Sequence, residues 1–206
     1  MSGDEGWTRR AADVAGSGLA LVALSPLFAL IALAIVVESG FPVFFSQERV
    51  GKGRRPFRIL KFRTMVVDAE RRGPKISGRR DPRVTRVGAL LRATKLDEFP
   101  QIANVLKGEM TLIGPRAEVP DMIRHYTPEE LTILDYRPGL TAPGQIYFTT
   151  DQAGALDGVE DAEAYYVEHQ LHPKLRMDLD YLRDRSALGD VRIVASTVKL
   201  LLGLGA

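Results

Sequence analysis

The chain has 206 residues, with 28 Lys and Arg against 26 Asp and Glu, a formal net charge of +2 and no Cys. The lack of Cys excludes a disulfide framework, a thiolate nucleophile and a Cys-based zinc site, and a hydrophobic content of 45% excludes a wholly disordered chain. The charge is unevenly divided: residues 1–40 carry 2 basic and 4 acidic groups, residues 41–116 carry 18 and 7, and residues 117–206 carry 8 and 15. A central block this positive needs an anionic partner or an acidic neighbour within the chain.

The first predicted element is a long apolar segment. From Val14 to Val37 there are 24 consecutive residues without a charge, enough for a helix to cross a hydrocarbon core about 30 Å thick. Ser25 and Pro26 lie at its middle, where the proline removes a backbone donor and clashes with the preceding turn, so we expect the helix to break or kink there. The Ser25 hydroxyl can satisfy a carbonyl that Pro26 frees.

Basic residues flank this segment on both sides. Arg9 and Arg10 precede it, and five more basic residues follow it between positions 49 and 58. Because basic residues prefer the cytoplasmic side of a membrane, a bent helix that enters and leaves the same leaflet suits both flanks. We therefore expect residues 1–40 to form a re-entrant membrane helix and residues 41–206 to form a cytoplasmic domain.

Three other interpretations of the apolar segment stay open. A straight crossing with a kink also fits its length, and it too leaves the body in the cytoplasm, where the basic excess is larger. A buried helix of a soluble protein fits less well, because such apolar runs are usually shorter than 18 residues. A cleaved signal peptide fits poorly, because the run exceeds the usual 7 to 15 residues and no small-residue cleavage site is evident.

Two aromatic-rich runs follow and predict a pair of strands. Residues 41–45 and residues 56–63 are separated by the glycine-containing stretch 51–54, which predicts a turn. In an extended strand Lys61 and Arg63 share one face, with Leu60 and Phe62 on the other. Two cations so placed suit a phosphate group, although a charged strand edge that prevents aggregation gives the same pattern.

Residues 66–83 are polar, basic and interrupted by Gly and Pro, which predicts a loop or short helical pieces. Such a surface can rest on anionic lipid, where each cation contributes about 1 kcal/mol. Nucleic-acid binding is the competing interpretation. The apolar segment and the lack of a recognisable reading module argue against it.

The next stretch places two adjacent carboxylates at the start of a predicted helix. Pro100 fits the first turn of a helix that begins near Asp97 or Glu98 and ends at about Lys107, with Gly108 as its stop. An Asp in this position is most often an N-cap. Its neighbours Arg92 and Lys95, however, favour an ionised carboxylate and also attract phosphate, so a functional role is open.

Two arginines are then expected on rigid turns. A strand over residues 110–113 ends at Gly114 and Pro115 and presents Arg116, and the order is repeated in reverse at Arg137, Pro138 and Gly139. A guanidinium held on a turn can bind phosphate oxygens in a bidentate manner. Both arginines can equally pair with the acidic last block.

The last third of the chain combines an acidic segment with an amphipathic one. Residues 149–177 are acidic and have helical spacing. Residues 191–202 place Val194, Val198 and Leu201 on one side of a predicted helix, which suits a membrane surface. The three histidines lack the spacing of a metal site.

Taken in order, these features resemble the bacterial sugar transferases, the monotopic phosphoglycosyl transferases. The resemblance covers about residues 8–147 and resumes near residues 180–202, where Asp190 falls in an Asp-x-x-Ile element. The matching motifs are the Ser-Pro break, Phe45-Ser46-Gln47-Glu48-Arg49-Val50-Gly51, Lys61-Phe62-Arg63-Thr64-Met65, Asp81-Pro82-Arg83-Val84-Thr85-Arg86-Val87-Gly88, Lys95-Leu96-Asp97-Glu98, Asn104-Val105-Leu106-Lys107-Gly108, Gly114-Pro115-Arg116 and Arg137-Pro138-Gly139.

The resemblance implies a fold, an activity and a location. It implies an α-rich α/β enzyme with short strands and amphipathic interfacial helices, on the cytoplasmic face of a bacterial inner membrane. It implies transfer of a sugar 1-phosphate from a UDP-sugar to polyprenol phosphate, with Mg²⁺ and release of UMP, as the first membrane step of surface glycoconjugate or exopolysaccharide synthesis. The implied partners are the UDP-sugar, polyprenol phosphate and membrane lipid, without nucleic acid.

Roles for individual residues follow from the same resemblance. Asp97 is the implied nucleophile and magnesium ligand, forming a phosphosugar-aspartyl intermediate, and Glu98 assists it. The expected substrate-binding residues, some from their own pattern and some from the resemblance, are Lys61, Arg63, Arg92, Arg116 and Arg137.

The chain also departs from the resemblance in two places. Residues 140–145 lack the Trp or second Gly that many members carry after Arg-Pro-Gly, and residues 149–177 are an insertion relative to shorter members. The sugar, the role of Asp190 and the oligomeric state are therefore not inferred. Two rival functions are a non-catalytic scaffold that docks on anionic lipid and a glycosyltransferase that releases UDP.

Overall fold

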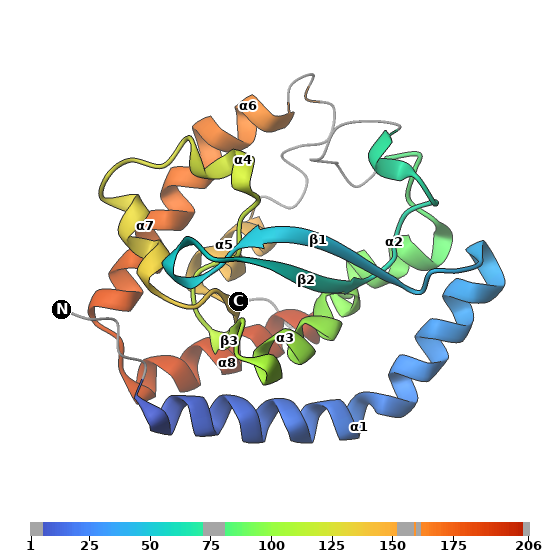
Figure 1. Cartoon of the computed structure of the whole chain (residues 1–206), viewed down its shortest axis with the longest axis horizontal. Coiled ribbons are helices and arrows are strands. Elements are labelled where there is room, and N and C mark those ends of the chain that lie inside the picture. Colours follow the sequence, from blue (N-terminus) through green and yellow to red (C-terminus); the bar gives the residue numbers. More distant parts are fainter. Residues whose placement is uncertain (1–5, 72–80, 152–158, 160–161, 204–206) are drawn as a thin grey trace.

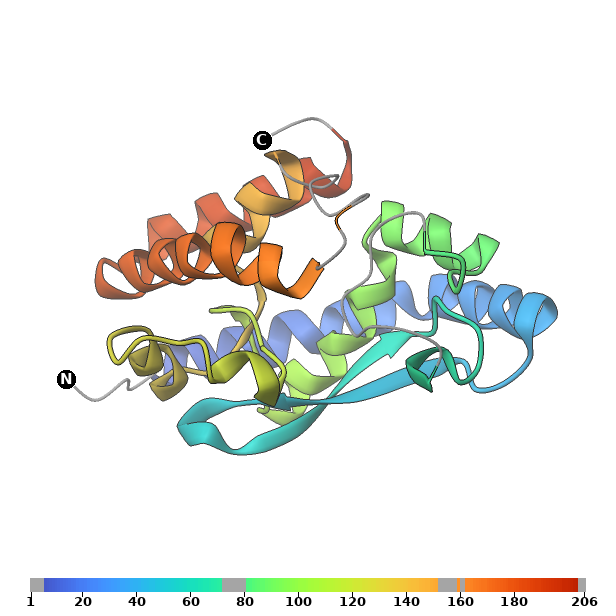
Figure 2. The same cartoon turned by 90° about the horizontal axis from the view of Figure 1, so that it is seen from above.

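The computed structural model describes residues 6–71, 81–151, 159 and 162–203. These residues form many helices and two small sheets of two strands each. In Figure 1 the N-terminal helix α1 curves along the lower and right-hand sides of the molecule, and the two strands β1 and β2 lie within that curve. Figure 2 shows the C-terminal helices on one side of the body and the first hairpin on the opposite side. The expectation of an α-rich fold with short strands is confirmed.

Helix α1 (Trp7–Ser39) contains the predicted proline kink but does not break. Pro26 has no N–H to donate to Val22, four residues earlier, and the Ser25 hydroxyl donates to that carbonyl instead at 2.8 Å. The helix therefore continues through Pro26 and bends, and Figure 1 shows its two halves running in different directions. A break was the wrong expectation, because Ser25 supplies the bond that the proline removes.

The middle of α1 is apolar and exposed. Among the described residues α1 is the one helix whose length and composition would allow it to cross a membrane, and 11% of its most apolar 18-residue window is buried. Large apolar side chains such as Leu19, Leu30 and Val37 lie on the surface. This exposure argues against a core helix of a soluble protein, which would be mostly buried.

The first turns of α1 are bonded to the body of the protein. The Arg10 guanidinium donates to the carbonyls of Val105 (2.6 Å) and Leu106 (2.8 Å). The buried Asp13 carboxylate accepts from the Thr111 hydroxyl at 2.8 Å and from the Leu112 N–H at 2.9 Å. A charged residue inside an apolar helix is thereby paired with the strand that leads to Arg116.

The last turns of α1 are bonded to the same body. The Arg63 guanidinium donates to the carbonyls of Ser39 (3.0 Å) and Gly40 (2.6 Å), which the helix end leaves without intrahelical partners. Glu38 accepts the N–H groups of Arg86 and Val87 at the start of α2 (Arg86–Ala93). Both halves of α1 therefore belong to one folded unit.

The predicted hairpin is present, with its first strand later than expected. Strands β1 (Phe44–Val50) and β2 (Pro56–Phe62) are antiparallel, and Phe44 lies opposite Phe62. The first strand was expected at residues 41–45, but Pro42 cannot donate to a ladder, and pairing begins at Phe44. The turn contains the short helix η1 (Lys52–Arg54), within which Gly53 adopts the left-handed conformation.

A second, parallel sheet joins the two arginine turns. Strand β3 (Thr111–Ile113) pairs with β4 (Gly139–Thr141), so Gly114 and Gly139 meet. A Cβ atom on Gly139 would lie 2.1 Å from the Gly114 nitrogen, which requires glycine at this crossing. The turns at residues 114–116 and 137–139 therefore pack against each other, which was not predicted from the sequence.

The remaining helices surround these sheets. Of the predicted loop over residues 66–83 the structure describes residues 66–71 and 81–83, which include a short helix at residues 69–71; its basic residues Arg79 and Arg80 lie outside the described residues. The helical spacing predicted for residues 149–177 and for residues 191–202 is confirmed where the structure describes them. These helices are η2 (Ala69–Arg71), η3 (Leu96–Gln101), α3 (Ile102–Lys107), α4 (Pro120–Ile123), η4 (Glu130–Asp135), α5 (Pro143–Asp151), α6 (Ala162–Tyr166), the π-helical turn η5 (Val167–Leu171), α7 (His172–Arg183) and α8 (Ala187–Leu201).

We expect the bonds of Asp13 to stabilise the packing of α1 on the body. In Asp13→Ala the Thr111 hydroxyl and Leu112 N–H lose a charged partner, which should cost about 2–3 kcal/mol of unfolding free energy. Thermal unfolding in detergent should show a midpoint several degrees lower. The exposed Asp135→Ala serves as the control and should leave the midpoint unchanged; equal midpoints for both variants would contradict this role of Asp13.

Candidate active site

The two carboxylates lie in η3, between α2 and α3. Lys95 adopts the left-handed conformation (φ 60°) and starts η3, so Asp97 and Glu98 occupy its first turn. The expected single helix is therefore a 3-10 helix followed by α3, and it ends at Gly108 (φ 87°) as predicted. Asp97 is not the N-cap, since Lys95 holds that position, and its side chain is free for another role.

Glu98 is held by three side chains from three different segments. Lys61 on β2 donates to it at 2.6 Å, Gln145 on α5 donates to it at 3.2 Å, and the Arg116 guanidinium lies 3.6 Å away. Burial alone would raise the pKa of Glu98, but the Lys61 and Arg116 cations outweigh it and hold the pKa well below its ordinary value. Glu98 is therefore ionised at every physiological pH.

Asp97 has the opposite environment. Within the described part of the chain its half-buried carboxylate accepts no hydrogen bond and forms no ion pair within 4 Å. Burial and the neighbouring Glu98 carboxylate raise the pKa of Asp97, against the opposing effect of Lys61, Lys95 and Arg92. Two adjacent carboxylates thus differ: one is fixed by cations, and the other is available to a ligand.

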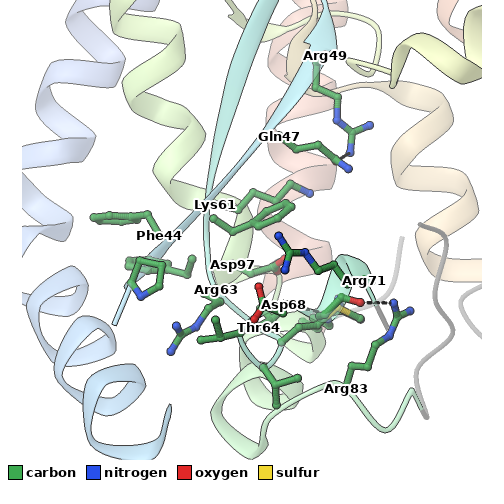
Figure 3. Close-up of a pocket in the computed structure, with 18 residues that line it drawn as sticks. Phe44, Gln47, Arg49, Lys61, Arg63, Thr64, Asp68, Arg71, Arg83 and Asp97 are labelled. Carbon is green, nitrogen blue, oxygen red and sulfur yellow. Dashed lines mark hydrogen bonds between the residues drawn. The ribbon is translucent and has the colours of Figure 1, made fainter. Parts of the chain in front are cut away.

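Asp97 opens into a cavity of about 510 Å³, here called the nucleophile cavity (Figure 3). Three of the five predicted substrate-binding residues line it, namely Lys61, Arg63 and Arg92. Arg71 and Asp68 line it as well, although the sequence analysis did not single them out. The structure therefore brings a free carboxylate and several cations to one hollow.

Arg63 has a structural contact as well as a place in this cavity. One of its nitrogens caps the end of α1, and in Figure 3 the guanidinium points toward that helix rather than toward Asp97. Its Nε and Nη1 atoms are buried without a hydrogen-bond partner. Arg92 is fixed differently, through a 3.0 Å bond from its Nε to the Thr64 hydroxyl.

Arg116 lies in a second hollow of about 300 Å³, here called the polar cavity, lined by Arg49, Lys95, Arg116, Gln170 and Lys174 among others. The polar cavity shares Gln47 and Arg49 with the nucleophile cavity. Arg137 lines neither hollow, because Arg-Pro-Gly is the strand partner of Gly-Pro-Arg. Substrate binding by Arg137 thus stays a prediction without support from its position.

A third hollow of about 240 Å³, here called the apolar groove, adjoins the carboxylates. Lys95, Glu98 and Gln145 line one part of it, and side chains from η3, β4, α5 and α8 line the rest, including Phe99, Val194 and Val198. The C-terminal helix therefore turns its apolar side toward this groove. The groove places apolar surface directly beside a fixed carboxylate.

The residues suited to a metal are few. Among the described residues no group of three or more His, Asp and Glu side chains is placed to hold an ion. Mg²⁺, however, is commonly held by one or two carboxylates together with substrate phosphates. Asp97 and Asp68, which both line the nucleophile cavity, fit this smaller donor set.

Several residues of the site were missed by the sequence analysis. Gln145, Glu118, Tyr166 and Lys174 lie far from Asp97 in the chain, and no local pattern marks them. Tyr166 donates to Glu118 at 2.8 Å, and Glu118 lies 3.7 Å from Arg49. Only Arg49 carried a signal, as part of the motif over residues 45–51.

The geometry defines a class of site: a free carboxylate among cations, beside an apolar groove, in a chain with an exposed apolar helix. Comparison with known proteins agrees with it. The sequence pattern of the family described as Bacterial sugar transferase matches residues 5–203. A UDP-glucose:undecaprenyl-phosphate glucose-1-phosphate transferase of Caulobacter vibrioides is 39% identical over 199 residues, covering 94% of this chain and 69% of that protein. The chain belongs to the bacterial sugar transferase family.

Other relatives differ in length. The exopolysaccharide production protein ExoY of Rhizobium meliloti is 32% identical over 210 residues, covering 94% of this chain and 84% of that protein. A UDP-glucose:undecaprenyl-phosphate glucose-1-phosphate transferase of Escherichia coli is 35% identical over 204 residues, covering 96% of this chain. The chain spans 41% of the length of that protein.

We expect the ionisation of Asp178 on α7 to oppose folding. Its buried carboxyl accepts the Gly144 N–H at 2.9 Å, and burial raises its pKa to about 7. The folded chain therefore binds this proton more tightly than the unfolded chain, and the resulting stability is lost as the pH rises from about 4 to about 7.

Asp178→Asn cannot ionise, so its unfolding midpoint relative to the natural chain should rise by several degrees between pH 5 and pH 8. A packing defect that does not depend on pH would shift the midpoint equally at pH 5 and at pH 8, so it does not affect this comparison. The exposed Asp180→Asn on the same helix should show no such change. A midpoint difference for Asp178→Asn that is independent of pH would contradict the raised pKa.

Proposed function

We propose that the chain transfers a sugar 1-phosphate from a UDP-sugar to undecaprenyl phosphate and releases UMP. The observation that carries this proposal is the contrast between Asp97, which is free, and Glu98, which is fixed by Lys61 and Arg116. A free carboxylate among cations can attack a phosphorus atom, because the cations offset the repulsion between two anions. The relatives from Caulobacter vibrioides and Escherichia coli are named for this donor and acceptor.

The reaction takes two displacements at phosphorus. An Asp97 oxygen bonds to the β-phosphorus of the donor, the bond from that phosphorus to the bridging oxygen breaks, and UMP leaves. An oxygen of the lipid phosphate then bonds to the same phosphorus, and the Asp97 carboxylate is regenerated. Lys61, Arg92 and Lys95 stabilise the negative charge that the phosphoryl oxygens carry in both steps.

Magnesium is part of the proposal. Asp97 and Asp68 would hold it together with the phosphates of the donor, and it would supply further neutralisation of charge. Glu98 acts through position: it keeps the Lys61 ammonium at the edge of the cavity beside Asp97. Its own proton affinity is too low for proton transfer near neutral pH.

The apolar groove supports a lipid acceptor. It reaches Glu98, Lys95 and Gln145 at one part, and apart from three threonines the remaining side chains that line it are apolar. A polyprenyl chain in this groove would place its phosphate beside the cations of the site. The alternative function, a non-catalytic scaffold, explains neither the free Asp97 carboxylate nor the apolar groove.

The arrangement of α1 supports a re-entrant helix, and the basic residues on both flanks favour the cytoplasmic face of the bacterial inner membrane. Asp13 near its start and Glu38 near its end are bonded to the same body, so both ends lie on one side of any membrane that the bend enters. A straight crossing would require one set of these bonds to break.

Replacing Asp97 tests the chemistry. Asp97→Asn keeps the shape of the side chain but is a poor nucleophile, so UMP release from UDP-sugars should fall by at least about a thousandfold. The natural chain, given a UDP-sugar without lipid acceptor, should carry a phosphosugar label on Asp97. The exposed Asp135→Asn should retain full activity. Normal turnover by Asp97→Asn would overturn the nucleophile, and release of UDP instead of UMP would overturn the reaction.

Cysteine labelling tests the topology, and the lack of natural Cys gives it no background. Gly6→Cys and Lys107→Cys place a thiol at exposed positions before α1 and in the body. In intact cells a membrane-impermeant maleimide should label neither variant, and both should react after lysis. Labelling of Gly6→Cys alone in intact cells would mean that α1 crosses the membrane.

A further inference from the structure

The polar cavity lies beside the point where a donor phosphate would meet Asp97. It shares Gln47 and Arg49 with the nucleophile cavity, and Arg116 in its lining is 3.6 Å from Glu98. A group attached to the reacting phosphate would therefore extend from the nucleophile cavity into the polar cavity. In a UDP-sugar that group is the sugar ring.

The lining of the polar cavity has the chemistry of a polyol site. Gln47, Gln145 and Gln170 supply amides, which both donate to and accept from hydroxyl groups. Phe148 and Tyr166 add aromatic surface against which the C–H face of a sugar can pack. A small number of placed polar groups on partly apolar walls is the usual composition of a small-molecule pocket.

The cations that line this cavity are Arg49, Lys95, Arg116 and Lys174, of which Lys95 also lines the apolar groove. Arg49 and Arg116 are matched by carboxylates, since Glu118 lies 3.7 Å from one and 3.9 Å from the other. Tyr166 donates to the same Glu118 and uses its hydroxyl proton in doing so. These three side chains are therefore engaged with the protein itself.

Lys174 and Gln170 are different, because they keep unused hydrogen-bonding capacity. The Lys174 ammonium lies 4.5 Å from the centre of the Tyr166 ring and 5.1 Å from that of Phe148. Of its three N–H groups, one donates to the Gln170 side-chain oxygen at 3.3 Å. The Gln170 amide nitrogen donates to no residue in the described part of the chain. The two side chains thus offer N–H groups that have no acceptor among the described residues.

The local backbone sets the spacing of this pair. Gln170 lies in the π-helical turn η5 and Lys174 in the first turn of α7. A π-helical turn widens the helix, is uncommon, and often occurs at functional sites. Both residues also belong to residues 149–177, a segment in which the sequence alone predicted no site residue.

We propose that the polar cavity receives the sugar ring of the donor, and that Lys174 and Gln170 determine which sugar is accepted by hydrogen bonding its hydroxyl or acetamido groups. This inference rests on the proposed function. A buried donor that must find its acceptor on the substrate discriminates strongly, because a sugar without that acceptor leaves the donor unpaired.

The test compares UDP-glucose, UDP-galactose, UDP-N-acetylglucosamine and UDP-N-acetylgalactosamine in UMP release by the natural chain, Lys174→Met and Gln170→Leu. Each variant should lower kcat/KM for the preferred sugar about tenfold or more and for the poorest sugar much less, so that selectivity falls. Affinity for UMP, which has no sugar, should not change. Lys174→Arg, which keeps a charged donor, should retain part of the selectivity.

Arg176→Met is the matched control, because Arg176 is an exposed cation on the same helix. It should alter neither selectivity nor UMP affinity. An equal loss of kcat/KM for all four sugars, or a parallel loss of UMP affinity, would assign Lys174 and Gln170 to structure and overturn the inference. Unchanged selectivity in both variants would overturn it as well.

Equilibrium binding separates this inference from the proposed function. If the natural chain released UDP, the proposed reaction would fail, yet the gain in affinity from UMP to the UDP-sugars would still report on the polar cavity. Lys174→Met should remove most of that gain. Equal affinities of the natural chain for UMP and for all four UDP-sugars would overturn the sugar site.

Discussion

The contact on which the site depends is the bond between the Lys61 ammonium and the Glu98 carboxylate, at 2.6 Å. It connects β2 to η3, and the further contacts of Glu98 with Gln145 and Arg116 bring in α5 and the turn after β3. A partly buried ion pair is weak support for stability, because desolvation offsets much of the attraction. Its consequence here is positional: four segments that are distant in the chain are held around one point.

The contacts of Glu98 also give the two adjacent carboxylates, Asp97 and Glu98, different properties. Lys61 and Arg116 lower the pKa of Glu98, and the negative charge of Glu98 in turn raises the pKa of Asp97. One carboxylate therefore organises the site and its neighbour faces the cavity. The nucleophile cavity and the polar cavity share Gln47 and Arg49, and the polar cavity and the apolar groove share Lys95 and Gln145. In the proposed function this arrangement would let a nucleotide, a sugar and a lipid chain approach one phosphorus atom from different sides.

Helix α1 is bonded to the body of the protein near both of its ends. Its bend follows from Pro26, and the Ser25 hydroxyl keeps the helix continuous by taking over the bond that the proline cannot make. Its two ends contact the strand before Arg116 and the helix before Asp97, through Asp13 and Glu38 respectively. Contacts at both ends couple the bent helix to the cations and carboxylates of the active site.

The amino-acid sequence by itself determined the local elements and the identity of the carboxylate pair. The kink, the hairpin, the end of α3 at Gly108 and the C-terminal helices follow from short-range rules for Pro, Gly and apolar spacing, and those rules do not depend on the rest of the fold. Lys61, Arg63 and Arg92, which line the same cavity as Asp97, were also singled out from the sequence, because ordered motifs in the first two thirds of the chain carry them.

Only the tertiary structure decided which distant residues share a site. Nothing in the pattern of Arg137 distinguishes it from Arg116. Both turns meet where β3 pairs with β4, yet Arg116 lies 3.6 Å from Glu98, whereas Arg137 lines neither the nucleophile cavity nor the polar cavity. Gln145, Gln170 and Lys174 reach the polar cavity because α5 and α7 pack against each other, with the Asp178 carboxylate accepting the Gly144 N–H. Such contacts depend on long-range packing, which no spacing within a single helix or strand encodes.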